Sequence, residues 1–138
     1  MEEKEEGEEI RGKTAEELLI LGEEYLSEGR YEDAIKVYKE IVKKEPLMPT
    51  LAKTCNDCGV AYANLEDYEM AIGFFNAALN LRDYLIDGGI STYYNLGQVY
   101  RLMGDDEKAE ESFRRGDRIK REQEERDEIA RRIFSSVE

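Results

Sequence analysis

Apolar residues recur along this chain at the spacing of an amphipathic helix. Leu18, Leu21, Gly22 and Tyr25 fall at positions i, i+3, i+4 and i+7, so they lie on one face of a predicted helix. The next stretch continues with the same helical spacing at Ala34, Tyr38 and Ile41. Between the two stretches lies the polar segment SEGRYED, whose glycine and acidic residues are typical of a helix end followed by a helix start. The pattern therefore predicts two short helices joined by a turn.

This helix pair is repeated three times. Each copy has two apolar residues three positions apart, a glycine directly after the second, and a tyrosine three residues after the glycine. An alanine follows each tyrosine after nine residues, and an aromatic residue follows each alanine after four. The glycines Gly22, Gly59 and Gly97 are spaced by 37 and 38 residues, which is a period typical of solenoid proteins. We therefore predict three stacked helix pairs.

Local signals set the expected boundaries of these helices. Thr14 followed by Glu17 has the spacing of a capping box and predicts the start of the first helix. Pro46 and Pro49 are expected to end the first pair, and the segment 87–89 (Asp-Gly-Gly) to end the second. Gly116 occupies the slot of Ala78 in the preceding copy, so we expect close helix contact there and no break.

The repeated motif resembles the tetratricopeptide repeat, whose signature is an apolar residue, then x-x-Leu-Gly-x-x-Tyr, then Ala-x-x-x-Phe and a closing proline. The resemblance covers about Ala15 to Arg121. Two departures stand out: the connections between copies are longer than the family's period implies, and only Pro46 matches the closing proline, because Asp83 and Arg121 hold the later slots.

The resemblance implies an all-α fold, a solenoid of three helix-turn-helix pairs wound as a right-handed superhelix. We expect a flexible acidic arm over residues 1–13, the repeat domain over 14–121, and a helical extension or cap over 122–138. In the extension, Ile129, Ile133 and Val137 recur every four residues and could pack against a second copy or another protein. The alternatives are that this extension is a solvated helix or that it folds back over the last repeat.

Both cysteines, Cys55 and Cys58, form a C-x-x-C pair, a spacing also found in redox and metal sites. They occupy the slots that Leu18 and Leu21 fill in the first copy, which favours burial in the core. A reactive dithiol is the less favoured alternative. A structural zinc ion needs about four ligands, and this sequence offers two cysteines and no histidine.

The composition of the chain disfavours several classes of partner and of activity. The formal charge of −13 disfavours nucleic acid and membrane surfaces as partners, because both are anionic. No phosphate-binding loop is present, and the absence of histidine removes the commonest general base. The sequence has no signal-peptide pattern or membrane span, and two cysteines agree with a reducing compartment. We therefore predict a cytoplasmic protein without catalytic activity or cofactor.

Solenoids of this kind expose a concave groove lined by the first helix of each pair, and in the family it typically holds a peptide or a helix of another protein. Helical spacing predicts the groove residues Leu19, Glu23, Lys53, Asn56, Val60, Tyr94, Gln98 and Arg101. Lys53 and Arg101 could meet a carboxylate on the ligand, or could instead pair with neighbouring acidic residues. The sequence thus favours a non-catalytic adaptor for another protein or peptide. Self-association through the C-terminal helix is the alternative, and a dithiol redox protein is less favoured.

Overall fold

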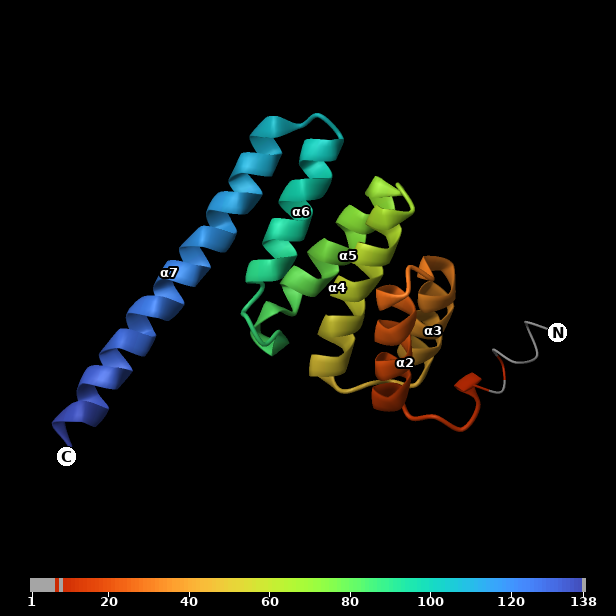
Figure 1. The fold of residues 1–138 in the computed structure, drawn as a ribbon, viewed down its shortest axis with the longest axis horizontal. Coiled ribbons are helices and arrows are strands. Elements are labelled where there is room, and N and C mark those ends of the chain that lie inside the picture. The colour runs from red at the N-terminus through yellow and green to blue at the C-terminus, as the bar shows by residue number, and fades with distance from the viewer. Residues whose placement is uncertain (1–6, 8, 138) are drawn as a thin grey trace.

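The computed structural model describes residues 7 and 9–137, and these residues form helices joined by short turns (Figure 1). The elements in chain order are α2 (Ala15–Ser27), α3 (Tyr31–Lys43), α4 (Met48–Asn64), α5 (Tyr68–Asn80), the short 3-10 helix η1 (Arg82–Tyr84), α6 (Ile90–Leu102) and α7 (Asp106–Ser136). The helices pack as the pairs α2/α3, α4/α5 and α6/α7, and each pair also contacts the next. The all-α solenoid predicted from the sequence is confirmed. We call the side formed by α2, α4 and α6 the first-helix face, and the side formed by α3, α5 and α7 the second-helix face.

The turn inside each pair is closed in the same way. The backbone carbonyl of the motif tyrosine accepts a hydrogen bond from the N–H five residues later: Arg30 to Tyr25 (2.8 Å), Asp67 to Tyr62 (3.0 Å) and Asp105 to Tyr100 (2.9 Å). The residue before each donor has a positive φ angle, and it is glycine in two turns but Glu66 (62°) in the second. The second turn therefore keeps the same backbone geometry even though it lacks the glycine that favours a positive φ angle.

Side chains complete the starts of several helices. Thr14 and Glu17 form the predicted capping box, in which the Thr14 hydroxyl accepts from the Glu17 N–H at 3.1 Å and the Glu17 carboxylate accepts from the Thr14 N–H at 3.2 Å. Asp67 and Asp105 cap α5 and α7 with their side chains, which accept from the N–H groups of Met70 and Lys108. These caps satisfy N–H groups that have no partner inside the helix.

The core explains why each motif pairs a glycine with an aromatic residue. A Cβ atom placed on Gly59 would lie 2.5 Å from the ring of Phe75, and one placed on Gly97 would lie 2.6 Å from the ring of Phe113. Gly22 stands in the same relation to Tyr38. Each ring therefore fills the space of a missing side chain on the partner helix, which brings the two helices of a pair close together.

The connections between pairs differ from each other. Pro46 lies between α3 and α4, whereas Pro49 lies in the first turn of α4, where no N–H is required, so Pro49 begins the second pair rather than ending the first. The second connection contains η1 and a turn ending at Gly89, which has a φ of 101°. Asp87 holds that turn by accepting from the N–H groups of Gly89 (2.9 Å) and Ser91 (2.8 Å).

The two ends of the chain extend beyond the repeats. Most of the predicted acidic arm lies outside the described residues, but Ile10 packs against the core of the first pair. At the other end, α7 continues without a break past Gly116. A Cβ atom placed on Gly116 would lie 2.7 Å from the ring of Tyr94, which confirms the close contact expected there. The side-chain amide of Gln123 donates to the Asp87 carbonyl at 2.9 Å, and beyond it α7 projects away from the repeats (Figure 1).

We predict that Gly59→Ala lowers the free energy of unfolding by about 1–3 kcal/mol, because the added methyl group overlaps the buried ring of Phe75. Gly73→Ala is the matched control, because nothing lies within 4 Å of its Cβ position in α5. It should stabilise the protein by about 0.5–1 kcal/mol through helix propensity alone. Urea unfolding measures both changes, and a Gly59→Ala protein as stable as the control would contradict this account of the core.

Candidate binding groove

A cavity of about 480 Å³ opens on the first-helix face, between the amino-terminal halves of α2, α4 and α6. The connection between the second and third pairs forms one wall of it. Its lining residues are Leu19, Pro49, Thr50, Lys53, Asn56, Tyr84, Leu85, Ile86, Asp87, Ser91 and Thr92. Side chains from all three helix pairs, or from the connection between them, thus meet around one space of a size usual for ligand sites.

Three of the eight predicted groove residues line this cavity: Leu19, Lys53 and Asn56. The Asn56 side-chain oxygen accepts a hydrogen bond from the Thr92 hydroxyl at 2.8 Å, which links α4 to α6 and fixes the orientation of the amide. Val60, by contrast, packs against the core cluster of the second and third pairs, and Gln98 is exposed without lining this cavity.

Lys53 lies between two carboxylates. Its ammonium nitrogen is 3.5 Å from Glu23 and 3.5 Å from Asp57. Asp57 is only 4% exposed, and burial raises its pKa while the charge of Lys53 opposes that shift. Of the two roles considered for Lys53, the structure shows pairing with neighbouring acidic residues. The lysine also compensates a buried carboxylate that would otherwise be costly.

Tyr94 and Arg101 lie against α7 and do not line the cavity. The Tyr94 hydroxyl donates to the Asp117 carboxylate at 2.6 Å, and its ring is 6.4 Å from the ring of Phe113. The guanidinium carbon of Arg101 lies 4.9 Å from the centre of the same Phe113 ring. In the last pair these positions therefore contact the long helix that follows, rather than the space shared with α2 and α4.

Sequence reasoning missed the contribution of the second connection. Tyr84 is half exposed and Ile86 is fully exposed, yet both line the cavity. The extra length of the segment containing LIDGGI was the available signal. Helical spacing predicts only which residues share a face of a helix, so it could not predict that this loop folds against the cavity.

Of the two cysteines expected in the core, Cys58 is part of the core cluster and Cys55 is not. Cys58 is 4% exposed, and burial raises its pKa to about 12, with smaller effects of Cys55 and Asp57. Cys55 is half buried, and burial raises its pKa also. Neither thiol is in a disulfide, and no group of three or more potential metal-ligating side chains occurs among residues 7 and 9–137. This environment disfavours the thiolate, the reactive form of cysteine.

Comparison with known proteins agrees with this architecture. Two tetratricopeptide repeat family models match the chain, one over residues 50–122 and the other over residues 17–47. The chain therefore belongs to the tetratricopeptide repeat family. A search of curated proteins gave no match. None of the helices in the described part of the chain is both long and apolar enough to cross a membrane.

Among solved structures, the crystal structure of MamA is similar, with a TM-score of 0.67 and 31% sequence identity. The match covers 77% of this chain and 58% of the MamA chain, so this chain corresponds to little more than half of that protein.

We predict that Cys58 reacts with a thiol reagent on the order of a hundredfold more slowly in the native protein than in urea, because burial suppresses its thiolate. Cys55 should react faster than Cys58, since it is half buried. Single Cys→Ser variants assign the two rates. Rapid native labelling of both cysteines would favour the dithiol alternative.

Proposed function

We propose that this protein is a non-catalytic adaptor that holds a peptide or a segment of another protein on its first-helix face. Membership in a family of interaction modules supports this role in general terms. The observation that carries the proposal is the cavity in which Leu19, Lys53 and Asn56 meet the second connection. Its affinity comes from shape and from a few anchors on a rigid scaffold, with no covalent step.

The cavity favours an apolar residue as the anchor of the ligand. Leu19, Tyr84 and Ile86 offer apolar surface, and Ile86 gains most from being covered because it is fully exposed. The Asn56 amide, held by Thr92, is positioned to hydrogen-bond the backbone of a bound segment.

Charge around the cavity favours a basic flank on the ligand over an acidic one. Glu23 and Asp57 flank Lys53, and Glu16 lies 3.4 Å from the Thr50 hydroxyl at the cavity edge. With Asp87 in the lining, four carboxylates against one ammonium group leave a local negative excess. We therefore propose a segment with an apolar anchor followed or preceded by lysine or arginine.

We expect Ile86→Glu to weaken binding of such a partner about tenfold or more, because it replaces an apolar anchor with a charge beside other carboxylates. Leu102→Glu is the matched control, since Leu102 is 64% exposed and lies away from the cavity. Partners captured from the source cell with the wild-type protein are quantified on both variants by mass spectrometry. Equal recovery on the two variants would refute the proposed site.

A second candidate function, self-association, rests on the end of α7. Ile129, Ile133, Phe134 and Val137 are each more than half exposed and share one side of the helix by their spacing. The preceding residues 121–128 carry a net charge of −3, and residues 129–137 carry +2. Antiparallel pairing of two copies would place each acidic half against a basic half while covering the apolar side.

We predict that light scattering shows a dimer for the wild-type protein and a monomer for Ile133→Lys, because the new charge would lie in the apolar contact. Ser135→Lys adds the same charge on the polar side of α7 and should leave the dimer intact. A monomeric wild-type protein at high concentration would remove this second candidate and leave the adaptor proposal standing.

A further inference from the structure

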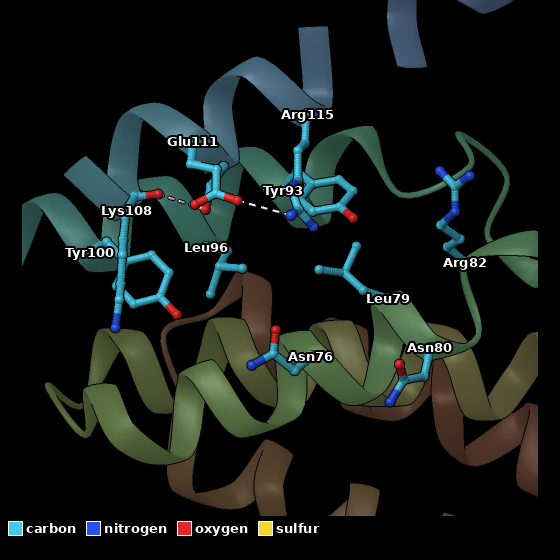
Figure 2. A pocket seen from close by; sticks show the side chains of 11 residues that line it. Asn76, Leu79, Asn80, Arg82, Tyr93, Leu96, Tyr100, Lys108, Glu111 and Arg115 are labelled. Carbon is cyan, nitrogen blue, oxygen red and sulfur yellow. Dashed lines mark hydrogen bonds and ion pairs between the residues drawn. The ribbon is translucent and has the colours of Figure 1, made fainter. Parts of the chain in front are cut away.

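A second cavity of about 480 Å³ lies where α5, α6 and α7 meet (Figure 2). Leu79 and Leu96 provide apolar surface, and the rings of Tyr93 and Tyr100 line it as well. Figure 2 shows that side chains from all three helices point into this one space. None of the predicted groove residues contributes to it.

Comparison between the repeats explains why this space is open. In the second pair, the ring of the motif tyrosine Tyr62 stacks on Phe74, with centroids 5.4 Å apart and planes 8° apart. In the third pair the motif tyrosine is Tyr100, and the residue 38 positions after Phe74 is Ser112. The Ser112 hydroxyl bonds back to the Lys108 carbonyl at 3.0 Å. The third pair therefore lacks the ring that covers the tyrosine in the second.

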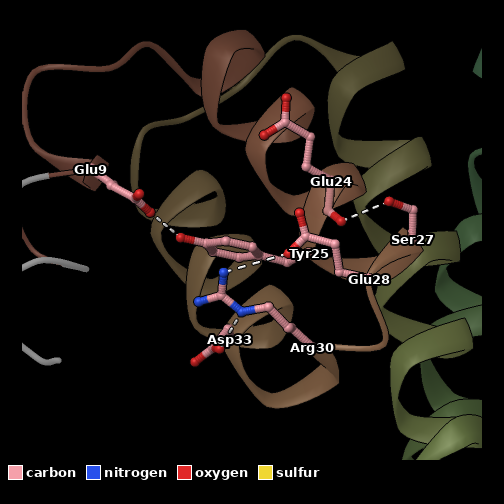
Figure 3. Close-up of polar contacts among 7 residues, drawn as sticks. All are labelled: Glu9, Glu24, Tyr25, Ser27, Glu28, Arg30 and Asp33. Atoms are coloured by element: carbon pink, nitrogen blue, oxygen red, sulfur yellow. Dashed lines mark hydrogen bonds and ion pairs between the residues drawn. The ribbon is translucent and has the colours of Figure 1, made fainter.

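The first pair covers its tyrosine in a different way. The guanidinium carbon of Arg30 lies 4.0 Å from the centre of the Tyr25 ring, and the Tyr25 hydroxyl bonds to the Glu9 carboxylate (Figure 3). Arg30 is held in place by Asp33 at 2.9 Å. In the first two pairs, a planar group of the chain itself lies close to the tyrosine ring, whereas in the third pair the corresponding neighbour is a more distant lysine. Tyr100 instead lines a cavity, with the Lys108 ammonium group 5.7 Å from its ring.

The lining of this cavity is positive in a protein that is strongly negative. Arg82, Lys108 and Arg115 line it with a single carboxylate, that of Glu111, against a formal charge of −13 for the whole chain. Arg115 contacts Glu111 at 2.8 Å, and hydrogen bonding to Tyr93 together with the charge of Glu111 raises the pKa of Arg115. Lys108 is 3.9 Å from Asp105, so its pairing is loose.

We propose that this cavity binds an aromatic side chain of a partner polypeptide that carries carboxylates next to it. The ligand's ring stacks on Tyr100 in the place that Phe74 takes beside Tyr62. The flanking carboxylates meet Lys108 and Arg115, the latter with the parallel hydrogen bonds that a guanidinium group allows. The site is separate from the first-helix face and favours the opposite charge on its ligand, so it would take a different segment.

The substitution Ser112→Phe tests this proposal, because it restores the ring that the preceding repeat supplies itself. The probe is the peptide acetyl-Asp-Phe-Asp-amide, titrated into the full chain and followed by amide NMR shifts. We expect wild-type shifts centred on Leu96, Tyr100 and Ser112, and an apparent Kd at least about tenfold higher in Ser112→Phe. The peptides acetyl-Asp-Leu-Asp-amide and acetyl-Lys-Phe-Lys-amide should bind more weakly, since each lacks one of the two features.

A second variant keeps the proposal testable if Ser112→Phe does not fold. Arg115→Glu reverses a charge on a side chain that is 57% exposed and should also weaken the Asp-Phe-Asp peptide about tenfold or more. Arg131→Glu, on the projecting end of α7, is its matched control and should bind as the wild type does. Unchanged binding by both cavity variants, shifts centred elsewhere, or no saturable binding by the wild type would overturn the proposal. Ile86→Glu should leave this binding intact, which separates the site from the proposed groove.

Discussion

The structure depends on one contact made three times, in which an aromatic ring on the second helix of a pair rests on a glycine of the first. Because a Cβ atom at Gly59 would lie 2.5 Å from Phe75, only glycine lets the two helices approach so closely. Tyr38 and Phe113 make the same contact in the other pairs. The contact fixes the geometry of each pair, and each pair then presents a similar surface for the next to stack on.

With the interior of each pair fixed in this way, the repeats differ at positions that the contact does not use. Phe74 and Ser112 occupy equivalent positions, yet one completes an aromatic stack and the other leaves a cavity beside Tyr100. The second connection is likewise longer than the first and reaches the first-helix face through Ile86. Both cavities therefore include residues of the second and third pairs, and the first cavity also includes Leu19 of the first pair. Function in such a solenoid is expected where repeats depart from one another, because positions alike in every copy serve packing.

The cations beside the two cavities also differ in their surroundings. On the first-helix face, Lys53 is held between Glu23 and the buried Asp57, so a cation that looked available for a ligand instead compensates an internal carboxylate. On the second-helix face, Lys108 and Arg115 line a cavity with only Glu111 among them. Residue type alone did not distinguish these two situations, because all of these cations have a carboxylate within 4 Å. The difference lies in burial, since Asp57 is buried whereas Glu111 and Asp105 are exposed.

The sequence by itself determined the three helix pairs, the capping box at Thr14, the burial of Cys58 and the uninterrupted course of α7 past Gly116. These follow from spacing along one helix and from comparison of the copies, which are local or repeated quantities. Only the tertiary structure decided that Leu19, Lys53 and Asn56 share a cavity while Tyr94 and Arg101 turn toward α7. The physical reason is that helical spacing fixes the direction of a side chain on its own helix, whereas its neighbours depend on the angle between pairs and on the path of the connection between them.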